Sequence, residues 1–74
     1  MLPGKLVKMA NEIGAFFEAD PEPARAQAGV ADHLRRFWDP RMRRELLGWL
    51  DSNDGDGLSP MVRAALVAHR ARLG

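Results

Sequence analysis

Three dipeptides in which a capping side chain precedes proline divide this chain into segments of similar length. They are Asp20-Pro21, Asp39-Pro40 and Ser59-Pro60. An aspartate or serine oxygen can accept a hydrogen bond from a backbone N–H in the first turn of a helix. Proline suits the first helical position, because the N–H it lacks would have no partner there. Each pair therefore predicts a helix start, and together they predict four helical segments.

The spacing of apolar residues also indicates helices in all four segments. Apolar side chains recur at steps of three and four, as in amphipathic helices, over Lys5–Glu18, about Glu22–Phe37, Pro40 to about Ser52, and Pro60–Leu73. Gly29 should weaken the second segment by roughly 1 kcal/mol relative to alanine, unless another helix crosses closely there. β-Branched residues are few, which disfavours strands. We expect an all-α fold, a small bundle of about four short helices in a single domain over residues 1–74.

The size of the chain limits the stability that its own core can supply. A domain of 74 residues buries only about 60% of its unfolded surface, and domains this small usually need a disulfide, a metal or a partner. The absence of cysteine excludes disulfides and thiolate metal sites. A partner chain or self-association is the stabiliser that remains.

No sorting or membrane signal is evident in the sequence. No apolar run approaches the roughly 20 residues of a membrane span, and the N-terminal stretch lacks the apolar core and cleavage site of a signal peptide. We therefore expect a cytoplasmic protein.

The stretch DSNDGDGLSPMVR invites interpretation as a calcium-binding loop. Ser52, Asp54 and Asp56 would stand at the first, third and fifth positions of that loop. The twelfth position, which should be a bidentate glutamate, is Arg63. Because a cation cannot bind calcium, the stretch is better interpreted as a polar loop that leads to the Ser59 cap.

Neither histidine has the spacing of a catalytic or metal site. His33 and His69 lie in different segments, without the HxxxH or HExxH pattern. His69 falls on an apolar side, where we expect it to be packed or half-buried. Because no nucleophile or phosphate-binding motif accompanies them, we expect no catalytic, cofactor-binding or metal-binding residue in this chain.

The stretch HLRRFWDPRMRRE, residues 33–45, concentrates charge in a chain that is otherwise nearly balanced. The whole chain has 11 Lys+Arg against 10 Asp+Glu, yet five arginines and one acid lie between Arg35 and Arg44. Once Asp39 is assigned to a cap, Arg43 and Arg44 have no acidic partner at helical spacing. Arginine and tryptophan are enriched at interface hot spots, and lysine is depleted at interfaces. We expect a partner-binding surface that comprises Arg35, Arg36, Trp38, Arg41, Arg43 and Arg44.

An ordinary solvated helix surface is the alternative interpretation of this stretch. Asp32 could pair with Arg35 or Arg36, and Arg41 with Glu45, at helical spacings worth a few tenths of a kcal/mol. Trp38 would then enter the core and leave at most one edge exposed. Similarly, one of the adjacent Phe16 and Phe17 side chains must point away from the other.

Three stretches of the sequence resemble a known family. MANEIGAFFEADP, GVADHLRRFWDPRMRREL and DGDGLSPMVRAAL resemble the delta subunit of the soluble, NAD-dependent, molybdenum-containing formate dehydrogenases of bacteria. The resemblance runs from about Lys5 to Leu66, and the block from Gly29 to Leu46 is its most distinctive part.

This resemblance implies a non-catalytic accessory chain with no cofactor of its own. In that family the alpha subunit carries the molybdenum cofactor and iron–sulfur clusters, and beta and gamma carry FMN, NAD binding and further clusters. The delta subunit supports assembly, stability or cofactor loading. The expected partners are the larger subunits, alpha first, with self-association open for the isolated chain and no membrane contact. The alternative function is a small helical nucleic-acid-binding module, which the lack of overall basic excess disfavours.

Overall fold

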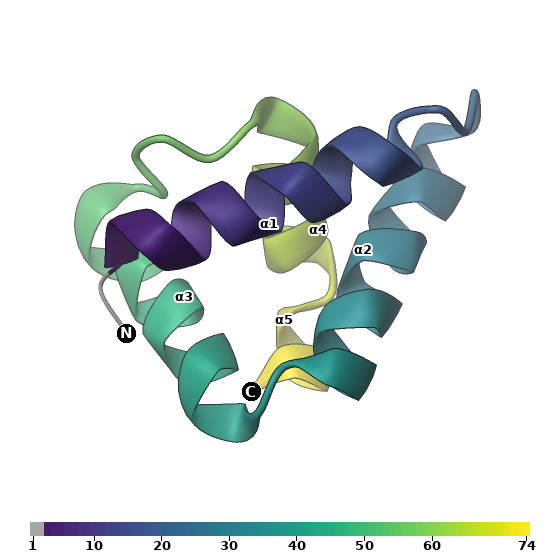
Figure 1. The fold of residues 1–74 in the computed structure, drawn as a ribbon. Coiled ribbons are helices and arrows are strands. Elements are labelled where there is room, and N and C mark those ends of the chain that lie inside the picture. The colour runs from purple at the N-terminus through teal and green to yellow at the C-terminus, as the bar shows by residue number, and fades with distance from the viewer. Residues whose placement is uncertain (1–2) are drawn as a thin grey trace.

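The structure is a computed structural model that describes residues 3–74, and its ordered elements are helices. They are α1 (Pro3–Phe17), α2 (Pro23–Phe37), α3 (Pro40–Asn53), α4 (Pro60–Ala68) and α5 (Arg70–Leu73). α1 runs across the front of the bundle, with α3 and α2 at its two sides and α4 behind it (Figure 1). Because the described residues contain no strand, the expected all-α bundle is confirmed.

Two of the three predicted helix starts are confirmed. A carboxylate oxygen of Asp39 accepts a hydrogen bond from the backbone N–H of Met42 at 2.9 Å, and α3 begins at Pro40. The hydroxyl of Ser59 accepts one from the N–H of Val62 at 3.3 Å, where α4 begins. Both aspartate and serine thus satisfy a backbone donor that the helix itself leaves unpaired.

The predicted start at Asp20-Pro21 is wrong, because α2 begins at Pro23 and Glu22 caps it without a side-chain hydrogen bond. If Pro21 were the first helical residue, Pro23 would be the third, and it has no N–H to donate to a capping carboxylate. A residue before proline also avoids helical backbone angles, which keeps Glu22 extended (φ −94°, ψ 108°).

The fourth predicted segment is interrupted near its end. α4 stops at Ala68, His69 has φ −113° and ψ 20°, and α5 continues from Arg70. His69 is half-buried, as expected. The change of direction accompanies the burial of Leu73, which is 1% exposed.

The core consists mainly of aliphatic side chains, which come from all five helices. The largest fully buried ones are Leu6, Val30, Leu34, Leu46, Val62, Leu66 and Leu73. Two glycines let helices approach closely: a Cβ on Gly14 would lie 2.3 Å from Val62, and one on Gly29 would lie 2.5 Å from the ring of Phe17. At Gly29, the close crossing that was left open as an alternative to a weakened helix is present.

Side-chain hydrogen bonds and an ion pair hold the loop between α3 and α4. Asn11 donates to the carbonyl of Gly57 at 2.9 Å and accepts from the N–H of Ser59 at 2.9 Å. Arg63, the residue that argued against calcium, forms an ion pair with Asp54. Within residues 3–74, no three His, Cys, Asp or Glu side chains form a group that could hold a metal ion. None of the described helices has the length and apolar character needed to cross a membrane.

Candidate docking surface at the corner between α2 and α3

The corner between α2 and α3 is short because only Trp38 and Asp39 separate the two helices. The N–H of Trp38 donates to the carbonyl of Leu34 at 3.0 Å and closes α2, while Asp39 caps α3. The indole ring is 6% exposed and packs in the core cluster. Trp38 therefore shapes the corner from inside.

Arg43 is the one buried charged residue among those described, with 8% of its surface exposed. Its Nη1 donates to the carbonyls of Arg35 at 3.0 Å and Trp38 at 2.9 Å, and its Nε donates to that of Leu73 at 3.3 Å. The carbonyls at a helix C-terminus lack internal donors and carry partial negative charge. A single guanidinium thus joins the end of α2, the first turn of α3 and the end of α5.

Of the six residues that were predicted to bind a partner, Arg43 and Trp38 therefore lie inside the molecule and expose almost no surface. Arg43 lies on the buried side of α3, on which Leu46, Leu47 and Leu50 follow it. Its guanidinium binds backbone carbonyls of its own chain, so a glutamate at this position would break the corner and not only a contact with a partner.

The other four arginines that were predicted to bind a partner are exposed: Arg35, Arg36, Arg41 and Arg44. Arg36 lies 3.3 Å from Asp32, one turn earlier in α2, and Arg72 of α5 lies 3.5 Å from the same carboxylate. Exposed pairs of this kind contribute little to stability. Within residues 3–74, the guanidinium groups of Arg35, Arg41 and Arg44 have no hydrogen-bonding or ion-pairing partner. These three arginines therefore remain available to another molecule.

A groove of about 840 Å³ lies beside Arg44, between α3 and the α4–α5 segment. Its lining residues are Arg44, Leu47, Gly48, Asp51, Val67, Ala68, Arg70, Ala71 and Gly74. Asp51 and Arg70 span it with a bidentate pair, of which one hydrogen bond measures 2.7 Å. Hydrogen bonds from Arg70 lower the pKa of Asp51. Sequence periodicity did not single out this groove, because most of its lining residues are small or polar.

An aromatic row lies on a different surface, across α1 and α2. Phe16 is 76% exposed and contacts the ring of Phe17 edge-on, at 5.2 Å between centroids. The row continues through His33 to Phe37, which is 71% exposed. Of the two adjacent phenylalanines, Phe16 faces solvent and Phe17 packs on Gly29. Their rings stay in edge contact and do not, as was expected, point away from each other.

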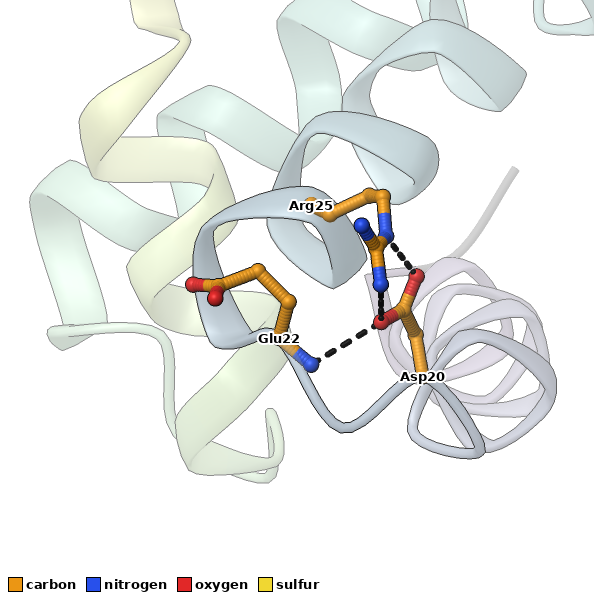
Figure 2. Close-up of polar contacts among 3 residues, drawn as sticks. All are labelled: Asp20, Glu22 and Arg25. Carbon is orange, nitrogen blue, oxygen red and sulfur yellow. Dashed lines mark hydrogen bonds and ion pairs between the residues drawn. The ribbon is translucent and has the colours of Figure 1, made fainter.

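The turn between α1 and α2 is closed by an exposed aspartate–arginine pair. Figure 2 shows the guanidinium of Arg25 facing both carboxylate oxygens of Asp20, and one of these oxygens also accepts from the N–H of Glu22 at 2.9 Å. The hydrogen bonds from Arg25, and next the one from Glu22, lower the pKa of Asp20. This pair stabilises a turn, and its arginine is already paired with a carboxylate of the same chain.

Comparison with known proteins identifies the family. The profile of the NADH-dependent formate dehydrogenase delta subunit, FdsD, matches residues 5–66. This chain belongs to the FdsD family. No curated protein and no solved structure matches the chain.

The FdsD match places the corner inside the family domain. It covers α2 and α3 in full, and with them all six residues that were predicted to bind a partner. α5 and the side of the groove that Val67, Ala68 and Ala71 provide lie beyond the matched range. The FdsD resemblance of the sequence is thus confirmed.

Proposed function

We propose that this FdsD-family chain is a non-catalytic accessory subunit of a cytoplasmic NAD-dependent formate dehydrogenase complex. In this proposal it supports assembly, stability or cofactor loading by docking onto a larger subunit, with alpha as the expected partner. The family match over residues 5–66 supports membership of the complex. The exposed arginines around the α2–α3 corner support docking there.

Electrostatics favours a partner that supplies carboxylates. Arg41 and Arg44 are one turn apart on the exposed side of α3, and neither has a counter-ion among residues 3–74. Like charges one turn apart repel each other by a few tenths of a kcal/mol. Carboxylates on a docked subunit would remove that repulsion, and the planar guanidinium fork is suited to bind them in bidentate fashion.

Trp38 and Arg43 contribute to this surface indirectly. By holding the ends of α2 and α3 together, Arg43 fixes the positions of the exposed arginines on both sides of the corner. The docking surface is therefore composed of Arg35, Arg36, Arg41 and Arg44, with Trp38 and Arg43 as its internal support.

Co-expression with affinity-tagged alpha subunit tests this function. The double change Arg41→Glu/Arg44→Glu should lower the amount of co-purified chain by at least about tenfold, because each reversed charge leaves a partner carboxylate unpaired. The matched control is Lys5→Glu/Lys8→Glu, an equal change in charge at exposed positions of α1. Circular dichroism should show wild-type helix content for both variants, because all four side chains are exposed.

If the folded arginine variant co-purifies at wild-type yield, the docking surface lies elsewhere on the chain. The exposed Phe16 would then be the next candidate. The chain purified alone should not reduce NAD with formate. Nucleic-acid binding would instead appear as affinity for duplex DNA with a steep dependence on salt.

A further inference from the structure

The groove between α3 and the α4–α5 segment is lined by a glycine that packing within the chain does not explain. Gly14 and Gly29 are explained by internal packing, because Val62 and Phe17 occupy the space where a Cβ would lie. A Cβ on Gly48 would meet no atom of the described chain within 4 Å. Gly48 lies in the middle of α3 and lines the groove.

A glycine in the interior of a helix weakens that helix relative to alanine, and no neighbour within residues 3–74 requires this one. The missing side chain does have one consequence at the surface. It leaves the backbone of α3 accessible from the groove, so that another backbone can approach it closely.

The groove also contains an unpaired cation and an exposed apolar side chain. Arg44 lies one turn before Gly48 on α3 and has no counter-ion within the described residues. Asp51, one turn further along α3, is already paired with Arg70. Across the groove, Val67 is 59% exposed. The charge that remains unbalanced in the groove is therefore positive, and it lies at the end where α3 begins.

We propose that this groove binds an amphipathic helix of a larger formate dehydrogenase subunit. The apolar side of that helix covers Val67, its backbone crosses α3 at Gly48, and one of its carboxylates pairs with Arg44. Binding of a helix in a groove between two helices is a recurrent mode of recognition. This inference rests on the proposed function and extends it from the arginines to the adjacent groove.

A steric block provides a test that leaves the fold of the chain intact. Gly48→Leu adds a side chain that the chain itself can accommodate but that fills the position proposed for the partner backbone. Co-purification with tagged larger subunits should fall by at least about tenfold. Gly4→Leu is the matched control, because a Cβ on Gly4 also meets nothing within 4 Å and this residue lies in the first turn of α1. Both variants should melt at or above the wild-type temperature, since leucine favours helix over glycine.

The charge at the end of the groove is tested separately with Arg44→Gln, which keeps the length of the side chain and removes its charge. The variant should dissociate from the larger subunits at lower salt than wild type does, because a partner carboxylate loses its counter-ion. Equal salt profiles for the two complexes would show that no carboxylate binds Arg44.

The outcomes separate this inference from the function on which it rests. If the wild-type chain does not co-purify with the larger subunits, the proposed function and the helix in the groove are both wrong. If wild type and folded Gly48→Leu co-purify equally, only the groove proposal is wrong. Sedimentation of the isolated chain tests whether a second copy of the chain binds in the groove instead. If Gly48→Leu dissociates a homodimer without affecting co-purification, the groove binds a second copy and not a partner helix.

Discussion

The two corners at either end of α2 contain the same Asp-Pro dipeptide but use it differently. At the α2–α3 corner, Asp39 accepts the N–H of Met42 and caps α3. At the α1–α2 corner, Asp20 accepts the N–H of Glu22 and the guanidinium of Arg25. The first aspartate stabilises a helix, and the second stabilises a turn that precedes one.

An arginine a few residues after each pair differs in the same way, Arg25 after the first and Arg43 after the second. Arg25 lies five residues after Asp20, is exposed and binds a carboxylate. Arg43 lies four residues after Asp39, is buried and binds three backbone carbonyls. The role of each arginine depends on which hydrogen-bond acceptor the fold leaves unpaired near it, a carboxylate or backbone carbonyls. It does not depend on the distance from the Asp-Pro pair. An arginine-rich stretch can therefore contain both arginines that support the fold from inside and arginines that are free on the surface.

The largest difference between the corners should appear when each arginine is replaced by methionine. Arg43→Met leaves carbonyls of Arg35, Trp38 and Leu73 without a donor, and a buried unsatisfied group costs about 1–3 kcal/mol. We expect a total loss of about 3 kcal/mol in the free energy of unfolding. Arg25→Met, at an exposed pair, should change stability far less. Urea denaturation followed by circular dichroism measures both.

Arg43→Lys separates the effect of the charge from that of the guanidinium shape. Lysine keeps the charge but cannot present a planar fork to carbonyls from α2 and α5 together. Its stability should lie between those of wild type and Arg43→Met. If Arg43→Met and Arg25→Met unfold at the same urea concentration, the buried guanidinium does not support the corner.

Replacing the two aspartates by alanine should also cost different amounts of stability, and this difference should be smaller than the one between the two arginines. Asp39→Ala removes the cap of α3 and should cost ~1 kcal/mol, whereas Asp20→Ala removes no helix cap and should cost less. Asp39→Asn is the control, since asparagine caps about as well as aspartate. Equal losses for the two alanine variants in urea denaturation would mean that the capping bond at Asp39 adds nothing to the corner.

Local signals in the sequence were sufficient to predict the helical segments and two of the residues at which helices begin. Asp39 and Ser59 act within one turn, so their roles could be predicted from neighbouring residues. At Gly29 the sequence left two possibilities open, a weakened helix or a close crossing, and the structure places Phe17 against this residue. At Asp20 the local signal was misinterpreted, because Pro23 keeps Glu22 in an extended conformation and delays the start of α2.

The parts of the site that could not be predicted depend on contacts between distant residues. The Leu73 carbonyl that Arg43 binds is 30 positions away, and nothing near Arg43 in the sequence indicates this bond. One signal did exist: Leu46, Leu47 and Leu50 follow Arg43 on the buried side of α3. The groove gave no signal, because its two sides come from segments that meet only in the folded chain.

The smallest expected effect is a dependence of stability on pH at the α1–α2 corner. Hydrogen bonds from Arg25, and then from the N–H of Glu22, lower the pKa of Asp20 below its usual 3.8. Between that lowered value and 3.8, the unfolded chain binds more protons at Asp20 than the folded chain does, so stability rises with pH in this window. The contribution of the pair is thus fully present above the unfolded pKa, and it is lost as pH falls through the folded one.

Asp20→Asn removes this titration and leaves Asp51, whose pKa is also lowered, in place. The difference in the free energy of unfolding between wild type and Asp20→Asn should therefore be constant above about pH 5 and shrink toward pH 2. Because the pair is exposed, 1 M salt should reduce the difference at every pH. Urea denaturation at each pH provides the measurement. Parallel stability curves down to the lowest pH would show that Arg25 does not stabilise the charged form of Asp20, and the contrast between the two corners would then lie in Asp39 and Arg43 alone.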